Sequence, residues 1–226
     1  MKKTLISILV AFAAVIGYSG TFAGKPFEGV ITFKITYPDS KFSESQLAMF
    51  PKLMTLSIKG NKSRTDMQMS GVNSVEITDY VNKTKVALIN MMGQKYAIKQ
   101  STADIEKAMG DNPKPTVELS SETKVVAGYT CKKALVTVNE DGVKSTFEAY
   151  YTSELGTKMA NFDSPVYKDI DGVLLEFVFS SKGINMKFTA TSIEKKNLSA
   201  KDFEIPSDYT LTTQEELKSK FGGGGE

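Results

Sequence analysis

The clearest feature of the sequence is a pair of segments in which β-branched and apolar residues alternate with polar ones on both sides of a short turn. Residues 128–151, GYTCKKALVTVNEDGVKSTFEAYY, predict two strands joined at residues 139–142, where Asp-Gly tolerates the positive φ of a tight hairpin. Residues 171–194 have the same form, with a turn at residues 180–183. We therefore predict two β-hairpins in the second half of the chain.

The first half of the chain alternates in the same way. In residues 27–37, Ile31, Phe33 and Ile35 fall on one face and polar residues on the other, which indicates a half-buried strand. Short turns containing Gly or Asn separate the segments that follow, as in an antiparallel meander. Further strands are predicted at residues 53–58, 62–69, 74–81, 85–91, 95–99 and 117–126.

Two or three short helices interrupt the strands. Residues 43–50 begin with Ser43 and Gln46 at the spacing of a capping box, and Pro51 ends this helix. A second helix is predicted at residues 102–109, followed by a linker at residues 110–115 between the two groups of strands. Residues 153–168 are predicted as loop or short helix, and residues 214–221 as a weak C-terminal helix.

These elements predict a mainly β fold of the α+β type. About ten strands follow one another without a β-α-β rhythm, which argues against a parallel sheet. A single antiparallel sheet of this length twists and curls, so we expect a half-open β-barrel whose concave face is covered by helices. The barrel domain spans residues 24–212, and residues 213–226 form a short helix and a flexible Gly-rich tail.

The N-terminus has the pattern of a secretory signal peptide over residues 1–23. Lys2 and Lys3 precede the mostly apolar residues 5–17, and Thr21 and Ala23 place small residues at the −3 and −1 positions. The rival interpretation is a membrane anchor, but the apolar run is shorter than the ~20 residues of a spanning helix. We expect cleavage after Ala23, a periplasmic or secreted product and no transmembrane anchor.

The charge balance and the cysteine content limit the partners and cross-links of the mature chain. Removing residues 1–23 takes away two lysines and no acid, which leaves 28 − 2 = 26 basic and 26 acidic residues. A chain of zero formal charge has no electrostatic reason to bind nucleic acid. Cys131 is the one cysteine of the sequence, so no internal disulfide can form. We expect a buried strand residue at Cys131, with a reactive or intermolecular thiol as the alternative.

The sequence contains no histidine, which excludes several classes of active site. Ser-His-Asp and Cys-His catalysis and imidazole metal sites all need that residue. The acidic residues form no recognisable catalytic pair, and no Gly-rich phosphate-binding loop is present. We therefore expect a protein that is not an enzyme, with no catalytic residue, no metal and no cofactor.

Apolar residues of the second hairpin, with two methionines of an earlier strand, are the candidates for a ligand-binding groove. Their alternation puts rows of flexible or aromatic side chains side by side on paired strands. The alternative is that these side chains pack against helices as core, and the pattern does not tell the concave face from the other. The candidates are Met67, Met69, Val173, Leu175, Phe177, Phe179, Ile184, Met186 and Phe188.

Several short motifs resemble those of a group of secreted proteins. Residues 128–134, GYTCKKA, resemble the GYxCKKA signature of secreted Bacteroidota domains that group with LolA-like folds, named after the outer-membrane lipoprotein carrier. Residues 149–152, AYYT, and 170–177, IDGVLLEF, fall where the related GLPGLI-type proteins carry an AWYT-like strand and their name-giving motif. Residues 203–209, FEIPSDY, resemble the closing segment of LolA-like domains. The resemblance covers most of the mature chain and implies an open barrel that shelters acyl chains.

Two functions of different kinds fit these observations. The first is an exported, non-enzymatic domain that binds a hydrophobic ligand, a lipid or an acylated protein, in an apolar groove of the half-barrel. The second is a structural or protein-interaction module of the cell envelope, with a filled core and no ligand. For the first we expect a monomer whose partner is a lipid or a lipoprotein.

The signal peptide gives a first testable prediction. When the full chain is expressed in a Gram-negative host, the protein recovered from the periplasmic fraction should begin at Gly24, because signal peptidase cuts after the small residue at −1. Intact-mass measurement of that fraction checks the new N-terminus. A membrane-bound product that retains residues 5–17 would contradict the prediction.

Overall fold

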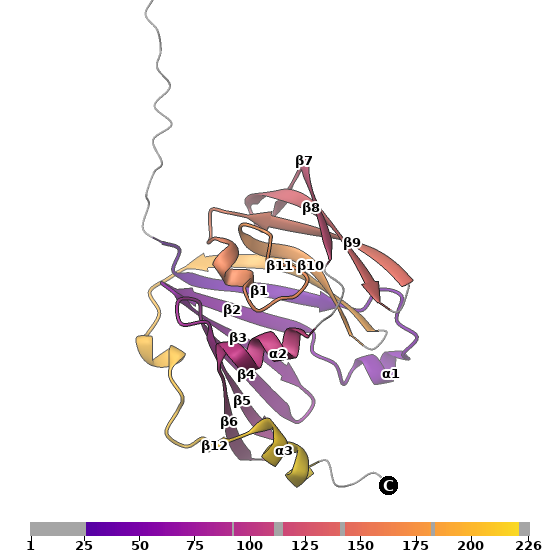
Figure 1. Cartoon of the computed structure of the whole chain (residues 1–226). Coiled ribbons are helices and arrows are strands. Elements are labelled where there is room, and N and C mark those ends of the chain that lie inside the picture. Colours follow the sequence, from indigo (N-terminus) through magenta and orange to yellow (C-terminus); the bar gives the residue numbers. More distant parts are fainter. Residues whose placement is uncertain (1–25, 92, 111–114, 141–142, 182–183, 222–226) are drawn as a thin grey trace, which may run out of the picture.

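The protein forms one 12-stranded sheet that curls without closing (Figure 1). The computed structural model describes residues 26–91, 93–110, 115–140, 143–181 and 184–221. Neighbouring strands follow the order β12-β6-β5-β4-β3-β2-β1-β11-β10-β9-β8-β7. The strands are β1 (Gly29–Thr36), β2 (Leu53–Lys59), β3 (Lys62–Met69), β4 (Val72–Asp79), β5 (Thr84–Met91), β6 (Gln94–Gln100), β7 (Thr116–Val126), β8 (Tyr129–Glu140), β9 (Val143–Thr152), β10 (Val173–Ser181), β11 (Ile184–Lys195) and β12 (Thr210–Thr212).

Some of the predicted features lie outside the described residues. These are the signal peptide at residues 1–23, residues 111–114 of the linker, the turn residues 141–142 and 182–183, and the glycine run at 222–225. The strands that flank both turns are described and pair as predicted, β8 with β9 and β10 with β11.

Strand β1 lies in the middle of the sheet and pairs on both sides, with β2 and with β11. It alternates as predicted, since Ile31 and Phe33 are fully buried and Lys34 is exposed. Strands β1 to β6 form the predicted antiparallel meander, in which each strand pairs with the next one along the chain. The first half of the protein is therefore built from local pairings.

The second half of the sheet starts from the opposite edge. After β6 the chain passes through helix α2 (Thr102–Met109) and reaches β7, which forms the far edge of the sheet. Strands β7 to β11 then pair one after another until β11 meets β1. The predicted division into two groups of strands is confirmed, and the two groups join through the β1–β11 pairing.

Irregular pairings help to bend this sheet into a half-open barrel. The register shifts between Thr32 and Phe33 in β1, between Leu174 and Glu176 in β10, and within β7. Such bulges bend a strand and increase its twist. The sheet keeps two open ends, at β7 and at the short β12.

The expectation of a purely antiparallel sheet is wrong at one edge. Residues Thr210–Thr212 form β12, which pairs in parallel with the middle of β6. The closing segment reaches this edge after a 3₁₀ helix, η2 (Ala200–Phe203). Three residues are too few to show an alternating pattern, so the sequence carried no strand signal there.

The helices are short and lie at the predicted places. Helix α1 (Glu44–Leu47) has the predicted capping box of Ser43 and Gln46 but ends three residues earlier than expected. Helix α2 lies across the sheet in front of β3 and β4 (Figure 1), and α3 (Gln214–Phe221) follows β12. Among the described residues, no helix combines the length and the apolar character needed to cross a membrane.

The core is built mainly by strands and loops, and α2 adds the buried side chain of Ile105. Within the described part of the chain, none of the three apolar clusters includes a residue of α1, α2 or α3. Helices of four and eight residues have too little apolar surface to cover the sheet. The space is filled instead by strand side chains and by the segment between β9 and β10, including Leu155, Tyr167 and Ile170.

The centre of the core is a group of four aromatic rings, in which Phe177 of β10 contacts the other three. Its ring stacks on Phe188 of β11 with centroids 4.8 Å apart and planes at 6°. The rings of Phe33 and Tyr167 meet it edge-on, at 6.0 and 5.8 Å. Phe177 packs against both of the larger clusters and so joins the two sides of the core.

Two phenylalanines of β10 allow a matched test of this packing. Phe177→Ala should lower the free energy of unfolding by about 3 kcal/mol, because it removes a ring with three aromatic neighbours. Phe179→Ala, two residues along the same strand and 50% exposed, should cost less than about 1 kcal/mol. Urea unfolding followed by circular dichroism measures both. Equal losses would contradict the central role of Phe177.

Candidate functional site

A long segment between two neighbouring strands builds the candidate site. Residues 153–172, here called the strap, connect β9 to β10 and contain the 3₁₀ helix η1 (Lys158–Asn161). Antiparallel neighbours need a turn of only two to five residues. The strap is far longer, and it folds back against the sheet near β1 (Figure 1). Long compact loops of this kind are often functional.

Hydrogen bonds to the backbone hold the strap in one shape. The buried side-chain amide of Asn161 donates to the carbonyl oxygens of Ile170 and Gly172, both at 2.9 Å. The Tyr167 hydroxyl accepts from the N–H of Val178 in β10 at 3.2 Å and donates to the carbonyl oxygen of the same residue. Buried polar groups that are satisfied in this way favour a single conformation.

Contacts with the meander fix the other side of the strap. The Lys85 ammonium lies 2.7 Å from a carboxylate oxygen of Asp163 in the strap and 2.8 Å from one of Glu76 in β4. Burial alone would lower the pKa of Lys85, but the attraction of the two carboxylates outweighs it and raises that pKa. The ring of Phe162 meets the ring of Tyr80 edge-on, with centroids 6.5 Å apart. The strap is therefore tied to both halves of the sheet.

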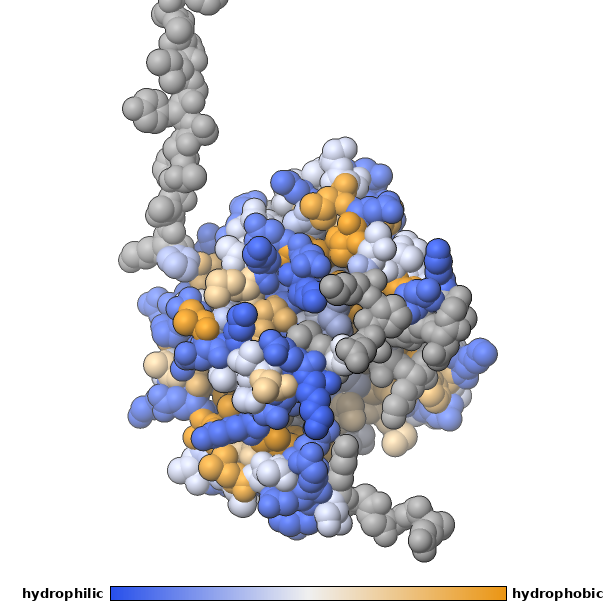
Figure 2. All heavy atoms as spheres, viewed as in Figure 1, coloured by the Kyte–Doolittle hydropathy of each residue, from blue (hydrophilic) through white to orange (hydrophobic). Residues whose placement is uncertain are grey.

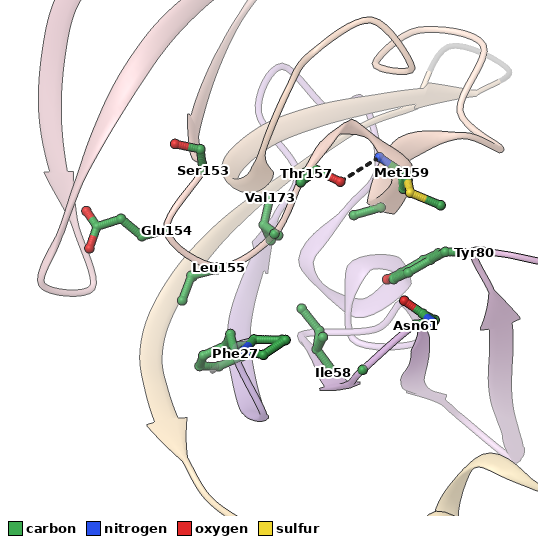
Figure 3. Close-up of a pocket in the computed structure, with 14 residues that line it drawn as sticks. Phe27, Ile58, Asn61, Tyr80, Ser153, Glu154, Leu155, Thr157, Met159 and Val173 are labelled. Atoms are coloured by element: carbon green, nitrogen blue, oxygen red, sulfur yellow. Dashed lines mark hydrogen bonds between the residues drawn. The ribbon is translucent and has the colours of Figure 1, made fainter. Parts of the chain in front are cut away.

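A pocket of about 440 Å³ opens between the strap and the turn that joins β2 to β3. This strap pocket has a size within the ~300–1,000 Å³ range of small-molecule sites. Figure 3 shows apolar side chains around its interior. They come from the segment before β1, the end of β2, the strap and the start of β10, and are Phe27, Ile58, Leu155, Met159 and Val173.

One corner of the strap pocket is polar and uncharged. The hydroxyl of Tyr80 and the side-chain amide of Asn61 lie together at the edge of the apolar interior (Figure 3). A backbone hydrogen bond of 2.8 Å from the Tyr80 N–H to the Asn61 carbonyl oxygen holds the two residues together. Burial raises the pKa of Tyr80 to about 12, so the hydroxyl stays protonated. In the same view, the side chains of Ser153 and Glu154 point away from the interior.

The structure separates the predicted groove residues into three groups. Val173 lines the strap pocket. Leu175 and Phe188 are buried in the core, and Phe177, Met67 and Met186 are half-buried against it. Ile184 is half-buried, whereas Met69 and Phe179 are 45% and 50% exposed. Aromatic packing thus fills the middle of the predicted groove, and open space remains beside Val173. Ligand binding by the other candidate residues stays a prediction.

Most of the pocket residues were missed by sequence reasoning. Phe27, Ile58 and Leu155 read as ordinary apolar positions, and Tyr80 and Asn61 lie at turns with no recognisable motif. One signal was available, because the strap is a long interruption between the two predicted hairpins, whose facing strands β9 and β10 pair in the structure. A long connection between adjacent strands indicates where a site is built. The sequence of that connection does not show which distant turns complete the site.

The exposed apolar side chains are dispersed over the molecule. Figure 2 shows small groups of hydrophobic residues among hydrophilic ones on the face it presents. Met49 near α1 and Leu119 and Val125 of β7 are the most exposed of the large apolar residues described, at 63%, 65% and 67%. Isolated exposed apolar residues are normal on protein surfaces. The strap pocket therefore remains the strongest candidate site.

A group of ion pairs ties the edge strand β7 to the inner strands. The carboxylate of Glu176 in β10 is almost fully buried and lies 2.8 Å from Lys124 of β7 and 3.0 Å from Lys187 of β11. Burial alone would raise the pKa of Glu176, but the two lysines lower it below its ordinary value. Lys124 also lies over the ring of Tyr150, 4.8 Å from its centroid. Because each group is paired within the fold, this cluster is structural.

Comparisons with known proteins give a family match and distant structural likenesses, one of which is described here. The family described as "N-glycanase peptide, N-terminal domain" matches residues 44–216, about three quarters of the chain. A crystal structure titled as a β-barrel-like protein of domain of unknown function DUF1849 from Brucella abortus aligns with a TM-score of 0.37 and 7% identity, over 76% of this chain and 99% of that one. A search of curated proteins finds no match.

The single cysteine provides a test of the packing beside the strap. Cys131 is fully buried, as predicted, and burial raises the pKa of its thiol to about 11. The thiolate is the reactive form, so at pH 8 the folded protein should react with a disulfide reagent at least tenfold more slowly than the urea-unfolded chain. Absorbance of the released thiol measures both rates. Fast labelling of the folded protein would show that Cys131 is accessible and reactive.

Proposed function

This chain belongs to the N-glycanase peptide N-terminal domain family. We propose that it is an exported, non-enzymatic domain that binds a hydrophobic ligand in the strap pocket. The ligand is a lipid or an acylated protein. One observation carries the proposal: five apolar side chains from four separate segments converge on an open space of about 440 Å³ instead of filling it. The apolar lining of this space, beside a close-packed core, supports a binding role.

The energetics of the pocket favour an apolar ligand. Phe27, Ile58, Leu155 and Val173 are nearly buried, and their side chains supply the interior of the pocket. An acyl chain that leaves water to lie against them gains about 0.8 kcal/mol for each buried CH₂ group. Met159, which is 44% exposed, lies at the entrance and can adapt to the ligand because its side chain is unbranched.

The arrangement of titratable groups supports a non-enzymatic role. No histidine occurs in the sequence, so a general base would have to be a carboxylate, a lysine or a tyrosine. Glu154 is the one carboxylate among the described residues that line the pocket, and it points away from the interior (Figure 3). The raised pKa of Tyr80 keeps that hydroxyl protonated. These groups can hydrogen-bond a ligand but are poorly suited to transfer a proton near neutral pH.

The family description favours a second candidate function. A domain described as part of an N-glycanase could serve such an enzyme by binding a glycan or a glycopeptide. Tyr80 and Asn61 would then contact sugar hydroxyls, and Phe27 would lie against a sugar face. The apolar character of the remaining lining argues for the hydrophobic ligand, and a binding assay distinguishes the two.

Two exposed methionines give a matched test of the proposal. Met159→Glu places a charge at the pocket entrance and should abolish retention of a hydrophobic ligand, because the carboxylate resists burial. Met49→Glu makes the same change beside α1, where the side chain is 63% exposed, and should leave retention unchanged. Native mass spectrometry of protein purified from cells, together with titration of the uncharged fluorophore 1-N-phenylnaphthylamine, measures retention and binding.

Three results would count against the proposal. Absence of any bound lipid together with absence of fluorophore binding would favour the structural module with no ligand. Binding that survives Met159→Glu would place the ligand elsewhere. Binding of a glycan or glycopeptide, in the absence of fluorophore binding, would favour the second candidate. Circular dichroism of both variants shows that the fold is intact.

A further inference from the structure

We infer that the strap pocket selects amphiphiles whose head group is uncharged, and that Tyr80 and Asn61 are the residues that recognise this head. The inference rests on the proposed function and adds the chemical class of the ligand. An alcohol, an amide or an ester would bind, whereas a free carboxylate or a phosphate attached to the same chain would be rejected.

The charges around the pocket are the first observation behind this inference. No lysine or arginine of the described residues lines the strap pocket, and the one acidic residue that does, Glu154, points outward (Figure 3). Three described lysines are next in sequence to lining residues: the ammonium of Lys59 is 2.6 Å from the carboxylate of Glu28, and Lys62 and Lys158 are exposed and do not line the pocket. An anionic head would lose its hydration on entering the pocket without gaining a partner of opposite charge, which is costly.

Lys85, which contacts the strap, is also paired with carboxylates. Lys85 lies between Glu76 and Asp163, at 2.8 and 2.7 Å, and holds the strap in place. Turning Lys85 toward an anion in the pocket would leave two carboxylates without their partner and would release the strap that forms one wall. The fold therefore assigns this positive charge to its own structure.

The polar corner is the second observation. Tyr80 is 9% exposed, and its hydroxyl hydrogen-bonds with the side chain of Ser63. The raised pKa of about 12 keeps this hydroxyl protonated throughout the physiological range, so it can donate a hydrogen bond to a ligand that accepts one. The side chain of Asn61 is exposed, so its amide N–H and carbonyl groups are open to a ligand. Together the two side chains offer donors and an acceptor without charge. This set matches a hydroxyl, an amide or an ester.

The positions of the two parts of the pocket define how such a ligand lies. The apolar side chains of Phe27, Ile58 and Val173 lie on one side and the polar corner lies on the other, at the edge of the interior (Figure 3). A chain in the apolar part therefore brings its head group to Tyr80 and Asn61. One hydrogen bond from a neutral donor changes affinity by about twofold to tenfold, which is measurable.

A displacement assay with four ten-carbon amphiphiles tests the inference. Decanol, N-methyldecanamide, decanoate and decyl phosphate compete at pH 8 with 1-N-phenylnaphthylamine bound to the mature protein, below their critical micelle concentrations. We expect the two uncharged compounds to bind at least about tenfold more tightly than the two anions. Equal binding of the uncharged compounds and the anions, or tighter binding of decanoate, would overturn the inference. The proposed function would still stand in that case, provided that the fluorophore itself binds.

Variants of the polar corner assign the selectivity to its residues. Tyr80→Phe and Asn61→Ala should each weaken decanol and N-methyldecanamide about fivefold and leave the fluorophore affinity unchanged. Ser153→Ala, which alters a lining residue that points away, is the matched control and should change neither. Asn61 is exposed, so its variant tests the inference even if Tyr80→Phe disturbs folding. Unchanged head-group selectivity in both variants would overturn the assignment.

A lysine next in sequence to the pocket provides the last control. Lys25 directly precedes Pro26, which lines the strap pocket. If decanoate binds best and this preference disappears in Lys25→Gln, a cation reads the head group and the inference is wrong. If the fluorophore does not bind the wild-type protein at all, the proposed function fails, and this inference fails with it.

Discussion

The stacking of Phe177 on Phe188 is the interaction on which the rest of the structure depends. It joins two neighbouring strands face to face, and Phe177 also packs against both larger apolar clusters. Tyr167 of the strap meets the same ring edge-on and hydrogen-bonds to the backbone of the next residue, Val178. The stack therefore fills the hollow of the curled sheet and anchors the strap over it. The strap pocket lies where this packing ends, beside Val173.

The strap shows what an ordered loop requires. Holding one residue of backbone in a single conformation costs about 1–2 kcal/mol, so a segment of this length needs many compensating contacts. Asn161 supplies two buried hydrogen bonds, Leu155 and Ile170 enter the core, and Asp163 reaches Lys85 on the far side. These contacts hold the strap in place, and none of them fills the strap pocket beside Met159. Rigidity at the rim combined with a gap beneath it is a property of preformed sites.

Local patterns in the sequence predicted much of the fold. The capping box of α1, the bounds of α2, the six strands of the meander and both long hairpins depend on residues close together in the chain, and these predictions are confirmed. The candidate site depends on distant residues, for example Lys85 and Asp163, which are 78 positions apart. Alternation along β10 shows that Val173, Leu175 and Phe177 are apolar, but not that the first borders a cavity while the others are packed. The resemblance to LolA-like proteins likewise stays a prediction.

The order of the strands has a consequence for how the chain reaches its final state. Strands β1 to β6 can pair as they emerge during synthesis, but the partner of β1 on its other side is β11, the second-to-last strand. Thr191 donates to the carbonyl oxygen of Thr32 across 159 positions of sequence, and Ile35 faces Phe188. Contacts of such separation slow folding. Until the last hairpin arrives, one edge of β1 and its apolar face stay uncovered, so the unfinished first half is an aggregation hazard that a chaperone would need to shield.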